Sequence, residues 1–409
     1  MDMMKDLRVR SISLLDTLSL PSTPHSLIRH PFKMTFPRRH FLRNTTTLGL
    51  AGSLGFNLKL EAAPTPALLE TKTISHLPNL YQGWPTLARC SNGQLLVVCS
   101  GGREQHVCPF GRVELQRSDD NGKTWTFPRT LLDGPIDDRD AGVLETAKGS
   151  LLVTTFTSLA YASIIPNDGR RARWLAAHNR ISEEERKNEL GEWMIRSTDG
   201  GITWSARYPT IVNSPHGPTQ LSDGRLLYAG KKLWNEGKEA GVCESRDDGQ
   251  TWQWLAAIPT REGDHHKDYH ELHAIEAGDG SLIIHIRNHN KTNVGETLQS
   301  ESQDGGKTWS TPHAIGVWGL PSFLTRLRDG RLLMSYGHRR KPFGNQARVS
   351  EDHGKTWSQP VTISGDGVSG DLGYPSTVEL EDGTFLTVWY EQTAKTRFAV
   401  LRQAHWKLA

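Results

Sequence analysis

One short motif occurs five times in this chain and constrains its fold more than any other feature. Each copy runs from a Ser through an Asp and a Gly to a Thr-Trp pair. The Asp carboxylate can accept backbone N–H groups within a turn, the Gly supplies the positive φ of a tight hairpin, and the Trp buries a large apolar face. We therefore interpret the repeated Asp as a scaffold residue. The copies are RSDDNGKTW (117–125), RSTDGGITW (196–204), SRDDGQTW (245–252), SQDGGKTW (302–309) and SEDHGKTW (350–357).

A second repeat, a short strand, a turn closing on Gly and an apolar strand, occurs six times and alternates with the first. Six such units, five of them followed by the Asp turn, predict an all-β fold: a six-bladed β-propeller of four-stranded antiparallel blades with Asp-box turns. The sixth unit lacks an Asp turn, so we expect residues 67–77 to complete its blade beside 397–408. An insertion at about 158–194 carries a capping box, Ser182 with Glu185, on a short helix. The turn glycines are Gly93, Gly149, Gly224, Gly280, Gly330 and Gly383.

Residues 1–67 are a different kind of sequence, an N-terminal extension before a propeller domain predicted at 68–409. Arg38 and Arg39 precede a modest apolar stretch within 36–56, a pattern that resembles a twin-arginine export signal. It predicts a periplasmic or secreted protein, with Met34 as an alternative start. A disordered basic tail is the competing interpretation.

Composition excludes several classes of protein. The net charge of +3 is close to balanced, which argues against wrapping a nucleic acid. No apolar run is long enough for a membrane span. The four cysteines lack the paired spacing of a zinc site, and they form either one disulfide or buried free thiols. We predict no metal and no cofactor. A metal bound by His270 and His273 is less favoured than a solvated polar loop.

The candidate site follows from aligning the repeats. In a propeller the innermost strand of each blade starts near the central axis, so equivalent starts face one shared cavity. The scaffold positions repeat, whereas these starts have diverged. We predict Tyr374 as a nucleophile and Glu271 as the base that takes its phenolic proton. A separate acid must then protonate the leaving group, and Asp140 is the other carboxyl group among these positions. The residues nine positions before the turn glycines are Trp84, Asp140, Pro215, Glu271, Pro321 and Tyr374.

Arginines complete the predicted site. Arg287 ends the second strand of the blade that starts with Glu271, and Arg339 and Arg340 occupy nearly the same place one blade later. Arg103 does so in the first blade. Guanidinium groups converging from several blades suit a carboxylate ligand, which they bind through paired N–H donors.

These motifs together resemble the bacterial sialidase (neuraminidase) superfamily over about residues 75–409. ELHAIEAGDGSLIIHIR (271–287) is similar to the family segment from the catalytic Glu to a carboxylate-binding Arg. GYPSTVELEDGTFLTVWYE (373–391) is similar to the segment with the nucleophilic Tyr. The resemblance implies that Tyr374 attacks the anomeric carbon and that Glu271 activates it. Arg287, with Arg339 or Arg340, would hold the sialic-acid carboxylate.

The chain departs from that family in its first blade. The family opens this blade with Arg-Ile-Pro, but QGWPTL (82–87) has Gly83 and Trp84 at the first two of those places. The acid/base Asp that the family carries further along is absent from REQHVC (103–108). By this comparison Arg103 would restore the missing cation, and Asp140, Glu104 or His106 the missing acid.

The sequence therefore predicts an exo-α-sialidase-like glycoside hydrolase acting on sialylated or other acidic glycans, with retention of configuration. The alternatives are a polysaccharide lyase or glycosidase for uronate-containing glycans, and a non-catalytic carbohydrate-binding propeller. A hydrolase of this kind needs Tyr374 and Glu271 within hydrogen-bond reach, whereas a lectin needs no such contact.

Overall fold

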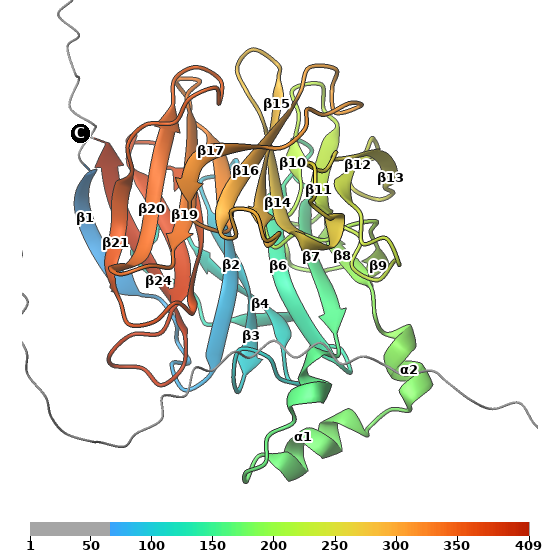
Figure 1. Ribbon diagram of the computed structural model, residues 1–409. Coiled ribbons are helices and arrows are strands. Elements are labelled where there is room, and N and C mark those ends of the chain that lie inside the picture. The colour runs from blue at the N-terminus through green and yellow to red at the C-terminus, as the bar shows by residue number, and fades with distance from the viewer. Residues whose placement is uncertain (1–65, 409) are drawn as a thin grey trace, which may run out of the picture. The chain divides into compact units, whose positions relative to one another are not determined.

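The computed structural model describes residues 66–408, which form the predicted six-bladed β-propeller (Figure 1). The predicted export signal and Met34 lie outside the described residues, and export stays a prediction. Six four-stranded antiparallel sheets are present. Blade I holds β2 (Tyr81–Arg89), β3 (Leu95–Arg103), β4 (Arg112–Ser118) and β5 (Arg129–Leu132). Blade II holds β6 (Asp137–Glu145), β7 (Leu151–Ser158), β8 (Glu192–Ser197) and β9 (Tyr208–Pro209). Blade III holds β10 (Thr219–Gln220), β11 (Leu226–Lys231), β12 (Ala240–Ser245) and β13 (Gln253–Ala257).

The remaining blades follow the same order. Blade IV holds β14 (Tyr269–Glu276), β15 (Leu282–Asn288), β16 (Glu296–Ser302) and β17 (His313–Trp318). Blade V holds β18 (Ser322–Arg326), β19 (Leu332–His338), β20 (Phe343–Ser350) and β21 (Val361–Gly367). Blade VI holds β22 (Leu372–Glu379), β23 (Phe385–Glu391), β24 (Val400–Leu408) and β1 (Pro66–Thr73). Within residues 66–408 no helix is both long and apolar enough to cross a bilayer.

The two ends of the described chain close the ring. Strand β1 pairs antiparallel with β24 from Pro66 opposite Leu408 to Thr73 opposite Arg402. The segment expected to complete the sixth blade therefore does so, and the blue strand β1 lies beside the red strands of blade VI in Figure 1. Because this pairing joins residues far apart in sequence, it fixes the last blade against the first.

The core lies between neighbouring blades. Between blades III and IV, Leu227 and Val242 belong to one buried cluster with Ile284, Leu298 and Trp309. Trp309 comes from an Asp-box turn and is only 8% exposed, which agrees with the packing role predicted for that Trp. Burial of such apolar surface stabilises the fold by roughly 25 cal/mol per Å².

Each Asp box is held by its own hydrogen bonds. In the fourth blade the Ser302 hydroxyl donates to Asp304 Oδ1 (2.8 Å) and accepts from the Gly306 N–H (2.9 Å). Asp304 also accepts from the backbone N–H and the hydroxyl of Thr308 at 2.9 and 2.7 Å. These bonds, the Thr308 hydroxyl first, lower the pKa of Asp304 to about 2. The contacts satisfy the Asp within its own turn, as a scaffold role requires.

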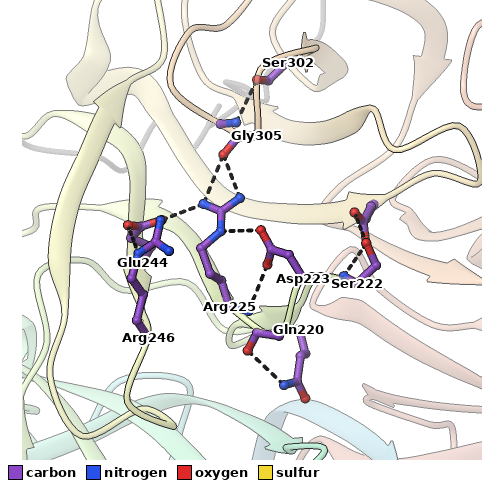
Figure 2. Close-up of polar contacts among 11 residues, drawn as sticks. Gln220, Ser222, Asp223, Arg225, Glu244, Arg246, Ser302 and Gly305 are labelled. Carbon is purple, nitrogen blue, oxygen red and sulfur yellow. Dashed lines mark hydrogen bonds and ion pairs between the residues drawn. The ribbon is translucent and has the colours of Figure 1, made fainter.

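The boxes also join neighbouring blades, on the face opposite the starts of the inner strands. Arg225, the residue before β11, donates to the Gly305 carbonyl of the next blade's box and to Glu244 of its own blade (Figure 2). The sixth blade has no box, and there Arg328 of blade V donates to the carbonyls of Leu380 and Glu381. The residues that hold the five boxes in this way are Arg117, Arg196, Arg225, Gln299 and Gln403.

We expect Arg225→Met to lower the free energy of unfolding by about 3 kcal/mol, because Glu244 would stay buried without its main partner. The side chains of Arg225 and Glu244 are only 12% and 10% exposed. Arg246 contacts the same Glu244 but is 68% exposed, so Arg246→Met should change stability by less than about 0.5 kcal/mol. Urea unfolding of both variants measures the difference. Equal losses would contradict the role given to Arg225.

The predicted insertion leaves blade II between β7 and β8. It contains a 3₁₀ helix (Ala160–Ile164) and the helices α1 (Arg171–His178) and α2 (Glu183–Asn188), which project away from the strands in Figure 1. A second 3₁₀ turn (His266–Asp268) precedes β14. The capping box is present, with Ser182 and Glu185 bonded reciprocally. The four cysteines are buried free thiols, so the disulfide alternative is wrong.

Candidate active site

Four of the six predicted inner-strand positions share an unusual backbone. Trp84, Asp140, Glu271 and Tyr374 have φ of 53°, 50°, 47° and 53°, a left-handed conformation that costs a non-Gly residue roughly 1–2 kcal/mol. At each of them the pairing with the second strand slips at a β-bulge. A bulge redirects a side chain, and strained residues of this kind cluster at functional sites. The repeated bulge explains how equivalent positions are aimed at one centre.

Tyr374 of β22 and Glu271 of β14 are in direct contact. The Tyr374 hydroxyl donates to Glu271 Oε1 at 2.5 Å. Arg287 of β15 donates from Nη1 to both oxygens of Glu271, at 2.7 and 2.5 Å, and to the Tyr374 oxygen at 3.0 Å. Three residues from two blades thus form one hydrogen-bonded group.

Charge and burial fix the protonation states of this group. Burial alone would raise the pKa of Glu271, but the charge and hydrogen bonds of Arg287, together with the phenol, lower it to about 2. Burial and the negative charge of Glu271 raise the pKa of Tyr374 well above its ordinary value. Glu271 is therefore a carboxylate at neutral pH, and Tyr374 is a neutral phenol whose proton points at it.

Asp140 of β6 is the second acid at the centre. It is 8% exposed, and its Oδ1 is buried without a hydrogen-bond partner among residues 66–408. Burial raises the pKa of Asp140 to about 6, against the positive charge of Arg139 and with the negative charge of Glu271. A carboxyl group with this pKa can hold a proton close to neutral pH, which suits a general acid.

The four predicted arginines divide into two pairs. Arg287 lies in the Tyr374–Glu271 group, and the Arg339 guanidinium lies 5.7 Å from the centre of the Tyr374 ring while its Nε donates to the Leu372 carbonyl. Arg340 is exposed and stacks on Trp318 at 3.4 Å instead. Arg103 has no exposed surface and pairs with Asp137 at 2.7 Å. The structure does not bring Arg340 or Arg103 into the site.

The two further candidates for the acid, Glu104 and His106, lie in different surroundings. Glu104 binds the insertion, because it accepts from the Trp174 indole N–H and from Arg173. His106 lies beside the site: its ring centre is 4.9 Å from that of Trp84, and its Nδ1 lies 3.0 Å from Asp371 Oδ1. Asp371 in turn accepts from two phenols, Tyr81 and Tyr390.

Tyr390, Asp371 and Tyr81 are site residues that the sequence analysis missed. Tyr390 packs on Tyr374 with ring centres 5.7 Å apart. A signal for it was present, because Tyr390 and Arg287 both stand seven positions after a turn glycine. Asp371 also stands at a repeated position, because Asp137, Asp268 and Asp371 each precede a turn glycine by twelve residues. Of the histidines considered for metal, His270 packs at a tilt against His289, and His273 stacks on Phe323. Among residues 66–408 no group of three His, Cys, Asp or Glu side chains is placed to hold a metal ion.

Comparison with known proteins agrees with this architecture. A family model for the BNR repeat-like domain matches residues 174–387, and the chain belongs to that family. A sialidase of Bacteroides fragilis is 27% identical over 259 residues, 58% of this chain and 44% of that protein. A sialidase of Clostridium perfringens is 23% identical, over 62% of this chain and 66% of its own length. The matched region thus spans less than two thirds of each relative.

Solved structures share the fold. A Dyadobacter fermentans protein of unknown function superposes with a TM-score of 0.70 at 21% identity, covering 85% of this chain and 100% of that one. The NanB sialidase of Streptococcus pneumoniae gives a TM-score of 0.57 at 17% identity, over 84% of this chain and 70% of its own. The predicted resemblance to the sialidase superfamily is confirmed. These identities show the propeller and leave the substrate to be argued from the site.

Proposed function

We propose that this protein is an exo-α-sialidase-type glycoside hydrolase that releases a terminal sialic acid, or a related acidic sugar, from glycans. The observation that carries the proposal is the contact of Tyr374 with Glu271 at 2.5 Å, held by Arg287. A structural tyrosine would need neither the strained backbone nor a buried carboxylate beside it. Relatives named sialidases support the same class of reaction.

The first step forms a covalent sugar–enzyme bond. Glu271 accepts the phenolic proton as the Tyr374 oxygen bonds to the anomeric carbon, and the bond from that carbon to the leaving oxygen breaks. Asp140 gives its proton to the leaving oxygen, so that the departing group leaves as an alcohol. In the second step Asp140 takes a proton from water and the water oxygen bonds to the anomeric carbon. The bond from that carbon to the Tyr374 oxygen breaks, and the freed phenolate recovers its proton from Glu271. Two displacements retain the configuration.

The substrate charge fits this use of a tyrosine. A neutral phenol approaches an anionic sugar without the repulsion that a carboxylate nucleophile would meet. Arg287 holds the pKa of Glu271 at about 2, where it is a weak proton acceptor. A bound sugar carboxylate adds negative charge beside Glu271 and competes for Arg287, and both effects raise the pKa of Glu271. Binding the correct anion therefore activates the base.

The test is hydrolysis of an aryl α-sialoside by the purified protein, with aryl uronides run in parallel. We expect release of the aryl group from the sialoside, and NMR of the first sugar product should show the α anomer. Turnover of the uronides alone, or an unsaturated product that absorbs in the ultraviolet, would replace the proposal by the uronate hydrolase or lyase. No turnover of any of these glycosides would favour a carbohydrate-binding propeller.

A further inference from the structure

We propose that Arg139 binds the carboxylate of the substrate, so that the anion-binding group of this site comes in part from the second blade. The inference rests on the proposed function for the identity of the sugar acid. Independently of the sugar, the guanidinium of Arg139, next to Asp140 on strand β6, recognises an anionic group placed next to Tyr374. Neither the resemblance in the sequence nor the predicted arginines pointed to this residue.

The first observation is an unsatisfied cation. The Arg139 Nε is buried and has no hydrogen-bond partner, and no side-chain hydrogen bond or ion pair of Arg139 occurs within residues 66–408. Buried polar groups are nearly always paired, so a buried Nε without a partner on a half-buried arginine is unusual. The adjacent Asp140 Oδ1 is unpartnered as well. A ligand that offers an acid group and a hydroxyl would bring partners to these two side chains, the guanidinium and the carboxyl group.

The second observation is how the guanidinium is held. Its carbon lies 4.5 Å from the centre of the Trp84 ring and 6.0 Å from that of Phe156, so aromatic faces position it without using its N–H groups. Trp84 is itself fixed by its left-handed backbone and lies with its ring centre 6.5 Å from that of Tyr374. Arg139 is therefore held against Trp84, which in turn lies against Tyr374, and its terminal N–H groups have no protein partner within residues 66–408.

The other arginines at the centre are more fully engaged. Arg287 uses Nη1 on Glu271 and Tyr374 and uses Nε on His289. Arg339 donates from Nε to the Leu372 carbonyl, so only its terminal nitrogens are left to bind a ligand. Arg103, the cation of the first blade, forms an ion pair with Asp137 and lies 5.0 Å from the centre of the Trp84 ring. Arg139 alone of these four has no hydrogen-bond or ion-pair partner for its side chain in the described part of the chain.

The experiment compares Arg139→Gln and Arg139→Lys with wild type on an aryl sialoside and on its methyl ester, which lacks the charge. Loss of a paired charge-assisted bond should raise KM for the acid about 10- to 100-fold, with a smaller change in kcat. The ester, already a poor substrate, should lose no more than about twofold. Arg139→Lys should fall between, because it keeps the charge but not the planar fork. Arg397→Gln, an exposed arginine on the β23–β24 loop, is the matched control with unchanged KM.

Calorimetric binding of a non-hydrolysable unsaturated sialic acid and of glucuronate separates the two proposals. Wild-type binding of the sialic acid that Arg139→Gln weakens about 10- to 100-fold supports both. Unchanged KM and affinity in Arg139→Gln overturn the role of Arg139 and leave the sialidase standing. Binding of glucuronate alone, lost in the variant, overturns the sialidase and supports Arg139. Binding of neither acid by wild type overturns both. Should Arg139→Gln not fold, Arg139→Lys gives the same comparison.

Discussion

The variant Tyr374→Phe is expected to lose at least about 10³-fold in kcat on an aryl sialoside, with KM within about threefold of wild type. The substitution removes one oxygen, the atom that forms the bond to the sugar. The ring keeps its contacts with Trp84 and Tyr390, and Arg287 still pairs with Glu271. Substrate binding should therefore survive while the covalent step fails. Steady-state kinetics measure both constants.

Two further variants make that result specific. Tyr336 is also buried, and its change to Phe removes the hydrogen bond that it donates to Gln346 and the one that it accepts from Arg348. It lies outside the site, so Tyr336→Phe should keep kcat within about twofold. Tyr374→Phe combined with Glu271→Gln should be no slower than either single variant by more than about threefold, because the two groups act in one step. Full activity in Tyr374→Phe would remove the nucleophile, and multiplicative losses in the double variant would separate Glu271 from it.

The architecture was predictable from the sequence because one strand–turn–strand unit occurs there six times. Turn glycines such as Gly280 and boxes such as that of Asp304 require local backbone geometry that few residues supply, so each copy marks the same point of a blade. Counting back from those glycines reached Asp140, Glu271 and Tyr374 because the spacing along an inner strand is conserved between blades. The ring closure by β1 followed from the missing outer strand of the sixth blade.

The arginines could not be assigned in the same way. Arg339 and Arg340 are neighbours in the chain, yet one faces Tyr374 and the other stacks on Trp318, because successive residues beyond a strand end point in different directions. Arg103 is neutralised by Asp137, a partner from the next blade that no local pattern reveals. The bulge that turns the four inner residues inward is likewise a property of strand pairing, and it was not visible in their sequence.

Asp140→Asn is expected to make the protein more stable and less active at neutral pH. The folded-state pKa of Asp140 is about 6, above the ordinary value of 3.8. Between those pH values the folded protein binds more protons than the unfolded chain, so stability falls as pH rises through this window. At pH 7 the penalty is fully present, and at 1.36 kcal/mol per pKa unit it amounts to about 3 kcal/mol. Asparagine has no charge to bury, and it tolerates the left-handed backbone of this position.

The pH dependence of that gain distinguishes it from simple repacking. Urea unfolding should show Asp140→Asn more stable than wild type by about 2–3 kcal/mol at pH 7 and by less than about 0.5 kcal/mol at pH 3, which lies below the pKa of Asp140 in both the folded and the unfolded chain. Asp138 is a matched control, because its pKa is also raised, to about 7, while its carboxylate accepts from the Gly134 N–H and it is not one of the inner-strand starts. Asp138→Asn should shift stability with pH and leave the chemistry of the leaving group alone.

Activity should move in the opposite direction and depend on the leaving group. A sialoside of a sugar alcohol needs a proton on its departing oxygen, so Asp140→Asn should lower its kcat/KM about 10²–10⁴-fold, whereas an activated aryl sialoside should lose far less. In wild type, cleavage of the sugar sialoside should decline as pH rises above about 6, where Asp140 loses its proton. Equal losses on both substrates, or an unchanged high-pH limb in the variant, would transfer the acid role to another group. His106 is then the remaining candidate, because it lies against Trp84 with its Nε2 unpartnered within residues 66–408.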